Sequence, residues 1–168
     1  MIRALPLLPE NVHFIVVGAG PDEMALKKLS RGLRLESRVR FVGHVNHDEL
    51  PQYLRACDIF VRPSRSEGMG NSFVEAFAAG LPVIATQEGG LSDIIFDEKR
   101  NPDMPITGWA VDKDSPDEIA EAVKNIMEKP EKARAVVATA KQMAIEKYDW
   151  DLIAAMMRER VFAPFLHE

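Results

Sequence analysis

Residues 62–86 read RPSRSEGMGNSFVEAFAAGLPVIAT, which we interpret as a strand end, a glycine loop, a helix and the next strand. The apolar side chains of Phe73 and Phe77, four residues apart, predict one buried helix face. This helix opens near Asn71 or Ser72, either of which could cap it, and the Gly-Leu-Pro that follows ends it. The order strand, loop, helix, strand is typical of a parallel α/β sheet.

Short runs rich in β-branched and aromatic residues recur on both sides of this stretch and alternate with segments of helical period. We expect strands at Val12–Val17, Val39–Val42, Ile59–Val61, Val83–Ala85 and Trp109–Val111. These strands are almost continuously apolar, as strands covered by helices on both faces are. The sequence therefore predicts an α/β fold with a doubly wound, Rossmann-like parallel sheet.

Two amphipathic helices are expected between the first three strands. Pro21 occupies a first helical position and Gly32 ends the first helix, since proline is tolerated at a helix start and glycine favours a stop. Asn46 followed by Glu49 is a capping box for the second helix, whose apolar face ends at Cys57. This position predicts that the Cys57 thiol is buried in the core.

The chain beyond residue 112 is expected to be helical. Ser115 begins a Ser-Pro-Asp-Glu sequence that combines a cap, a first-position proline and a capping glutamate. Apolar residues at helical spacing follow in two stripes, and a third helix starts near Asp149. We therefore predict one domain over residues 1–168, with an α/β core at about 12–112 and a helical extension at about 115–168.

The composition of the 168 residues is that of a folded globular domain, with 46% apolar and 28% charged residues. Lys and Arg number 21 against 26 Asp and Glu, a net charge of −5, which argues against a nucleic-acid partner. The single cysteine excludes an internal disulfide framework and a cysteine-based zinc cluster, and the four histidines lack metal spacing. No apolar run approaches the roughly 18 residues of a membrane span, and we expect a cytoplasmic, reducing location.

The loop that opens the helix after residue 62 carries the residues with the clearest chemistry. Backbone N–H groups at residues 69–73 lie at a helix N-terminus, where the helix dipole favours phosphate. Gly68 and Gly70 allow a tight turn and a close approach of a ligand to the backbone. Glu67 precedes the helix and Glu75 lies about one turn into it, with its Cβ tilted toward the same mouth. Because a carboxylate accepts hydrogen bonds from two neighbouring hydroxyls, this arrangement suits a nucleotide sugar.

Other interpretations of these residues stay open. Glu75 could only complement the helix dipole, and the two glycines could only shape a turn. Gly89 and Gly90 could line the same cleft or form only a turn. The Gly-Ala-Gly at 18–20 is compatible with a dinucleotide-binding turn, but Glu23 replaces its third glycine and no acidic residue closes the following strand, which disfavours an NAD enzyme.

Residues 64–85 follow the pattern S-x-x-E-G-x-G-N-x-x-x-E-A-x-A-x-G-x-P-V-I-A. This pattern closely resembles the donor-binding signature of retaining GT-B glycosyltransferases of the group 1 type, whose paired glutamates fall on Glu67 and Glu75. The likeness extends from about residue 12 to about residue 123. Three further runs resemble the same family, namely VRFVGHV at 39–45, ACDIFVRPS at 56–64 and GGLSDII at 89–95.

The resemblance implies a role for each residue of the signature. Glu75 would hold the ribose hydroxyls of the donor nucleotide, and Glu67, the candidate catalytic residue, would contact the transferred sugar. The nucleobase would lie against the loop around Val45. The backbone N–H groups that meet sugar and pyrophosphate would be those of Gly68, Met69, Gly70, Asn71 and Ser72. The family transfers a hexose from a nucleotide-activated donor to an acceptor hydroxyl with retention, and neither a metal nor another cofactor is expected.

The chain also departs from the family's pattern. In the family, a strand, a glycine-rich turn, an Arg and a Lys precede this region, as does an N-terminal acceptor-binding domain, and none of these is recognised before Val12. We therefore expect the C-terminal, donor-binding half of a GT-B architecture, a fragment that is inactive alone and needs the acceptor domain or a partner chain. The full-length enzyme could lie at the membrane surface.

The absent strand is central in the sheets of related enzymes. The strands at 12–17 and 59–61 are therefore expected either to become direct neighbours or to accept a strand from another chain, which would give a homo-oligomer. Two alternatives to a transferase domain remain, a non-catalytic nucleotide-binding or interaction module and a sugar-nucleotide epimerase-like domain. The paired glutamates disfavour the epimerase.

Overall fold

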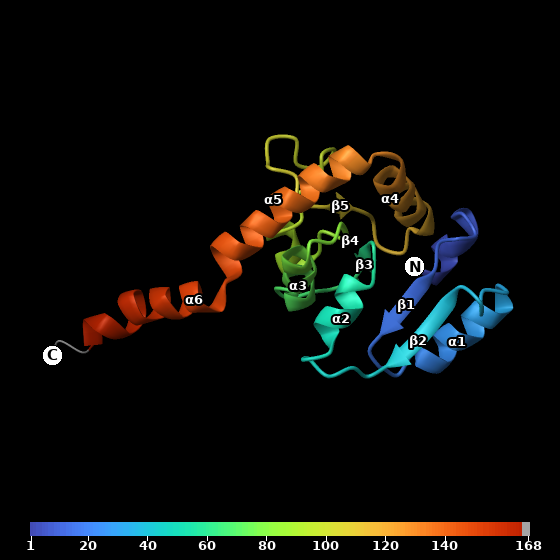
Figure 1. Ribbon diagram of the computed structural model, residues 1–168, viewed down its shortest axis with the longest axis horizontal. Helices are drawn as coiled ribbons and strands as arrows, with labels where there is room; N and C mark the ends of the chain where they lie inside the picture. Colours follow the sequence, from blue (N-terminus) through green and yellow to red (C-terminus); the bar gives the residue numbers. More distant parts are fainter. Residues whose placement is uncertain (166–168) are drawn as a thin grey trace.

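The computed structural model describes residues 1–165 and shows strands alternating with helices along the chain (Figure 1). Every pairing between named strands is parallel. The predicted α/β class is thus confirmed, and each predicted strand is found with its ends shifted by two residues or fewer. The strands are β1 (Phe14–Val17), β2 (Val39–Gly43), β3 (Phe60–Arg62), β4 (Val83–Ala85) and β5 (Trp109–Ala110).

Six α-helices are described, together with four short helical segments of other types. The α-helices are α1 (Glu23–Gly32), α2 (Leu50–Arg55), α3 (Asn71–Ala79), α4 (Pro116–Glu128), α5 (Pro130–Tyr148) and α6 (Trp150–Met157). The short segments are η1 (Ile2–Leu7), η2 (Gly89–Asp93), η3 (Arg158–Phe162) and η4 (Ala163–Phe165).

The strands form two sheets, one in the order β1-β2 and one in the order β3-β4-β5. The expectation that β1 and β3 become direct neighbours is wrong for the described residues, because each pairs within its own sheet only. Packing joins the sheets instead. Side chains from β1, β3 and η1 meet in one apolar cluster, in which Leu5 is fully buried, and η1 packs on α4.

A second apolar cluster lies around α3 and fixes the helix that follows the glycine loop. Phe73 and Phe77 have no exposed surface, as their spacing predicts, and α3 packs against α5. Ile94 and Ile95, which follow η2, complete this cluster. The start of α3 therefore rests on a packed core, and this core fixes the position of the loop at its mouth.

Three predicted helix ends are found in the structure, at Ser115, Asp149 and Gly80, and the start of α3 has a different N-cap residue. The Ser115 side chain accepts from the backbone of α4, and the Asp149 side chain accepts two backbone N–H groups of α6. Gly80 ends α3 at φ 78°. The N-cap of α3 is Gly70 at φ 70°, without a side-chain cap, so the open alternative that Asn71 or Ser72 caps this helix does not apply. A Cβ at Gly70 would lie 2.7 Å from the Phe73 ring, so the tight turn requires glycine.

Three local expectations about the early helices need correction. Pro21 lies in a turn, because α1 begins only at Glu23. Glu49 does accept from the backbone N–H of Asn46 at 3.4 Å, yet α2 begins after this contact. Cys57 lies beyond the end of α2 and is half-buried, and this burial, with Asp58 nearby, raises the pKa of its thiol.

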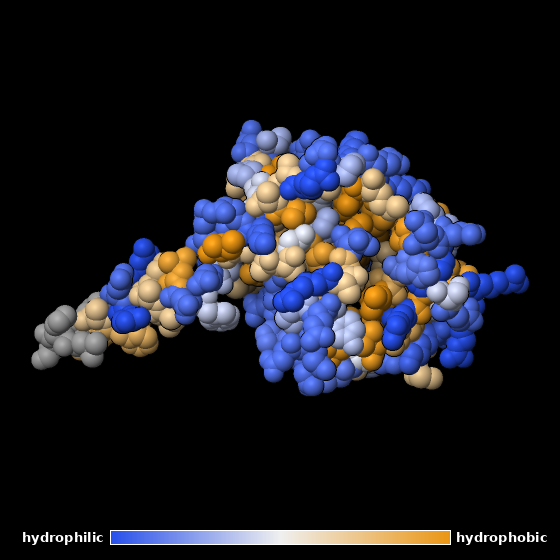
Figure 2. Space-filling model, in the orientation of Figure 1, coloured by the Kyte–Doolittle hydropathy of each residue, from blue (hydrophilic) through white to orange (hydrophobic). Residues whose placement is uncertain are grey.

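Within the helical extension, α4 and α5 pack on the body of the molecule, whereas α6 projects away from it (Figure 1). Apolar side chains gather along this segment in Figure 2, and Trp150 is 76% exposed. Among residues 1–165, no helix is both long and apolar enough to cross a membrane.

Candidate functional site

The parallel order of the strands brings several loops to one edge of the three-stranded sheet. The carboxyl ends of β3, β4 and β5 all point the same way, so the loops after them are neighbours. Ligands of open α/β sheets bind at such an edge. The sequence-predicted residues 67–72 lie in the loop after β3 and in the first turn of α3.

The loops after β3 and β4 touch backbone to backbone. A Cβ on Gly89 would lie 2.0 Å from the carbonyl oxygen of Glu67, and one on Gly90 would lie 2.5 Å from that of Gly68. The hydroxyl of Thr86 also donates to the Ser64 carbonyl at 2.6 Å. The two glycines after β4 therefore pack directly against the backbone of Glu67 and Gly68, and a side chain at either position would displace that loop.

The N-terminus of α3 presents unused backbone donors. Gly70 makes no side-chain cap, and the N–H of Phe73 donates to the Gly70 carbonyl at 2.9 Å. Within the described residues, the N–H groups of Met69, Gly70, Asn71 and Ser72 donate to no backbone or side-chain acceptor. Of the N–H groups predicted at residues 69–73, only that of Phe73 thus has an acceptor. The N–H of Gly68, which the resemblance adds to the predicted donors, also has none among the described residues.

Glu67 is held beside this helix end with 15% of its side chain exposed. Its Oε2 accepts from the Ser64 hydroxyl at 3.2 Å and pairs with Arg62 Nη2 at 3.1 Å. Arg62 also donates to the Ser72 hydroxyl at 2.6 Å. Sequence reasoning gave Arg62 no role. The one sequence feature that could have indicated a role is its position at the end of β3, at the sheet edge where ligands of α/β sheets bind.

Glu75 lies beyond the first turn of α3, which contains no acidic residue. The dipole effect is strongest within that turn, so the dipole acts on Glu75 more weakly than on a residue of the first turn. Its Oε1 lies 3.8 Å from His47 Nδ1, and its side chain is 32% exposed.

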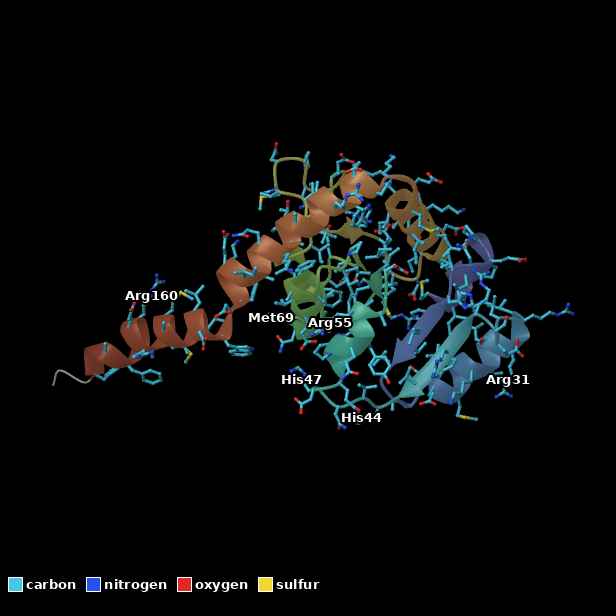
Figure 3. All side chains as sticks on the ribbon, in the orientation of Figure 1. Arg31, His44, His47, Arg55, Met69 and Arg160 are labelled. Carbon is cyan, nitrogen blue, oxygen red and sulfur yellow. The ribbon has the colours of Figure 1, made fainter. Side chains whose placement is uncertain are left out.

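The contact with His47 brings the loop after β2 to α3, and α2 packs against α3. Figure 3 labels His44 and His47 on the segment that leads from β2 to α2, and Met69 at α3. Val45 is half-buried in this segment. The structure thus places the predicted base-binding loop beside Glu75, while no contact is described between Glu67 and Glu75.

Two ion pairs connect the loops around this edge. Arg65 pairs with Asp114 at 2.8 Å, and Lys113 pairs with Glu88 at 2.9 Å. Hydrogen bonding to Arg65 holds the pKa of the Asp114 carboxyl below its usual value. The loops after β3, β4 and β5 are therefore connected by two ion pairs.

Two cavities of about 360 and 600 Å³ lie outside the candidate site, the first beside Trp109 and Arg100 and the second between Phe96 and α5. Neither is lined by residues of the signature. No group of three or more metal-ligating side chains occurs within residues 1–165.

Comparison with known proteins agrees with the resemblance at the level of the family. The family model described as "Glycosyl transferases group 1" matches residues 1–143. A GDP-mannose-dependent alpha-(1-6)-phosphatidylinositol monomannoside mannosyltransferase of Mycobacterium tuberculosis is 32% identical over 95% of this chain and 42% of that protein. The sulfoquinovosyl transferase SQD2 of Arabidopsis thaliana is 30% identical over 93% of this chain and 29% of that protein.

Solved structures show the same relationship. Anabaena Alr3699/HepE in complex with UDP-glucose has a TM-score of 0.85 at 26% identity and covers 96% of this chain and 44% of its own. The C-terminal domain of the group 1 protein LpcC from Francisella tularensis has a TM-score of 0.75 at 25% identity, with 89% of this chain and 77% of its own covered. The chain thus spans less than half the length of the curated relatives named above.

Proposed function

Since this chain belongs to the group 1 family of glycosyl transferases, we propose that it binds the nucleotide-activated sugar donor of such an enzyme. The reaction is transfer of a hexose from the nucleotide to an acceptor hydroxyl. The observation that carries this proposal is the N-terminus of α3, where the N–H groups of residues 68–72, between Glu67 and Glu75, have no acceptor among the described residues. An anion and hydroxyl groups are the ligands that such a set binds.

The donor is proposed to extend from the loop after β2, in the two-stranded sheet, to the loops after β3 and β4, in the three-stranded sheet. Its ribose hydroxyls meet Glu75, its base lies against the loop around Val45, and its transferred sugar meets Glu67. The pyrophosphate lies at residues 68–72. The β2–α2 loop lies beside Glu75, which supports this arrangement of the donor. A single extended ligand could then contact this loop with its base and Glu75 with its ribose.

We further propose that transfer retains the anomeric configuration and uses no metal. When the bond to the nucleotide breaks, negative charge develops on the leaving phosphate. Unused N–H groups at a helix N-terminus are oriented toward such charge before the reaction begins. This chain's contribution is thus binding and charge stabilisation.

The acceptor is proposed to be held by a further domain or by a partner chain. Holding two reactants together contributes about 7–11 kcal/mol in favourable cases, and the proposed donor site holds only one of them. We therefore propose negligible transferase activity for residues 1–168 alone. The free edges of β1 and β3 are proposed to accept a strand from another chain, which would make oligomers detectable by light scattering.

Calorimetric titration with UDP, GDP and ADP, each with and without its sugar, tests the proposed function. We expect one nucleotide series to bind, with measurable heat and one site per chain. No binding in any series at millimolar ligand would contradict the proposal. The assigned site would be contradicted if a variant with both Glu67 and Glu75 replaced by glutamine bound the nucleotide sugar as tightly as the parent does.

A further inference from the structure

Arg62 makes a set of contacts that the donor-binding role of the neighbouring residues does not explain. Its Nη2 pairs with Glu67 Oε2 at 3.1 Å, and its Nη1 donates to Ser72 Oγ at 2.6 Å. Its guanidinium carbon lies 5.6 Å from the centre of the Phe73 ring. One side chain therefore connects the candidate catalytic carboxylate to the first turn of α3.

The core fixes where this guanidinium sits. Phe73 is fully buried, and its ring packs edge-on against Phe60 at 5.4 Å between centroids. Phe60 and Arg62 are two residues apart on β3, so both side chains leave the same face of the strand. The buried Phe73 ring thus contacts both Phe60 and Arg62. The Arg62 guanidinium lies over a ring that the core holds in place.

The consequence for Glu67 is that its two oxygens are not equivalent. Oε2 takes both donors, Arg62 and the Ser64 hydroxyl. Oε1 makes no hydrogen bond or ion pair within the described residues. We propose that Arg62 is a positioning residue, which holds Glu67 by one oxygen so that the other faces the donor sugar. This inference rests on the proposed function.

The arrangement also requires arginine rather than any cation. A guanidinium has separate donors in a rigid fork, whereas an ammonium is a compact point charge that does not reproduce that geometry. Ser72 Oγ accepts from the fork, so the hydroxyl proton of Ser72 remains free to donate elsewhere. Arg62 therefore sets the orientation of a carboxylate and of a hydroxyl at once.

The positive charge of Arg62 bears on stability as well as on geometry. The Arg62 side chain is 49% exposed whereas that of Glu67 is 15% exposed, so water screens only one partner of this ion pair. A cation at a helix N-terminus also faces the positive end of the dipole. Loss of Arg62 therefore also removes the cation beside a mostly buried carboxylate, which is why the melting temperature of each variant is measured beside its affinity.

Arg65 supplies a matched control in the same loop. It pairs with Asp114, is 77% exposed and does not contact Glu67. Arg65→Gln therefore removes one positive charge three residues away while leaving Glu67 Oε2 with both its donors.

The experiment measures the dissociation constants of UDP, UDP-glucose, GDP and GDP-mannose for the parent chain and four variants. The variants are Arg62→Gln, Arg62→Lys, Arg65→Gln and Glu67→Gln, each checked for folding by its melting temperature. We define the sugar increment as the dissociation constant of the nucleoside diphosphate divided by that of the corresponding nucleotide sugar. We expect Glu67→Gln and Arg62→Gln to reduce this increment by the same factor, about fivefold to tenfold. Arg62→Lys restores it only in part, and Arg65→Gln leaves it unchanged.

A double variant, Arg62→Gln with Glu67→Gln, completes the test. If Arg62 acts through Glu67, the double variant loses no more of the increment than Glu67→Gln alone. The inference is overturned if the sugar increment of the double variant falls by the product of the two single-variant factors. It is also overturned if Glu67→Gln reduces the increment and Arg62→Gln leaves it unchanged. In both cases the proposed function stands. If the parent binds none of the four ligands and neither ADP nor ADP-glucose, the proposed function and this inference are both wrong.

Discussion

Gly90→Ala tests whether the loops after β3 and β4 form one unit. A Cβ at this position would lie 2.5 Å from the Gly68 carbonyl oxygen, 3.1 Å from its carbon and 3.3 Å from Met69 Cα. All three atoms are backbone, so no side chain can rotate away. The β3–α3 loop must instead shift by roughly half an ångström or more, and overpacking of this kind costs about 1–3 kcal/mol.

The expected result has two parts. The melting temperature falls by about 2–12 °C, at about 2–4 °C per kcal/mol for a domain of this size. Nucleotide-sugar affinity falls about tenfold, because the loop that moves carries the donors for the ligand. Differential scanning fluorimetry and calorimetric titration measure the two effects.

Gly20→Ala is the control for Gly90→Ala. A Cβ at Gly20 has no neighbour within 4 Å, so this variant should match the parent in both measurements. If Gly90→Ala also matches the parent in melting temperature and in affinity, the two loops do not touch, and the site as described here is refuted.

Three further outcomes follow from local features. Ser115→Ala removes the side-chain acceptor at the start of α4 and should lower the free energy of unfolding by about 1 kcal/mol in urea denaturation. Phe77→Ala empties a fully buried position and should cost about 3–5 kcal/mol in the same assay, so a loss below 1 kcal/mol would contradict the packing around α3. Arg65 lowers the pKa of Asp114, so this pair adds stability above the unfolded carboxyl pKa and loses it as the pH falls through the lower folded value. NMR titration of Asp114 in Arg65→Gln should show the pKa return toward its ordinary value, and an unchanged pKa would contradict the pairing.

Features set by neighbouring residues could be predicted from the sequence. The strands are short apolar runs between turns, and the caps at Ser115 and Asp149 depend on residues two or three positions away. Glu67 and Glu75 belong to one motif, and the same signature indicated the helix end between them. Local chemistry is enough for such features, because the backbone brings these groups together without help from distant segments.

Features set by distant segments could not be predicted in the same way. Gly89 and Gly90 were ambiguous, because only the fold brings them to Glu67 and Gly68. Arg62 gave no signal beyond its place at a strand end, since its partners lie across a loop and on a helix. The division into two sheets was also missed, because strand pairing is a tertiary property that apolar runs do not specify.

Nucleotide affinity of Glu75→Gln beside Glu67→Gln is the most direct test of the donor site. Hydrogen bonds to a charged group contribute about 1.5–3 kcal/mol, so loss of one or two to the ribose should weaken the nucleoside diphosphate by roughly tenfold or more. Glu67→Gln should weaken the nucleotide sugar and leave the bare diphosphate nearly unchanged. If Glu75→Gln binds the diphosphate as tightly as the parent does, Glu75 does not hold the ribose and the proposed donor site is wrong.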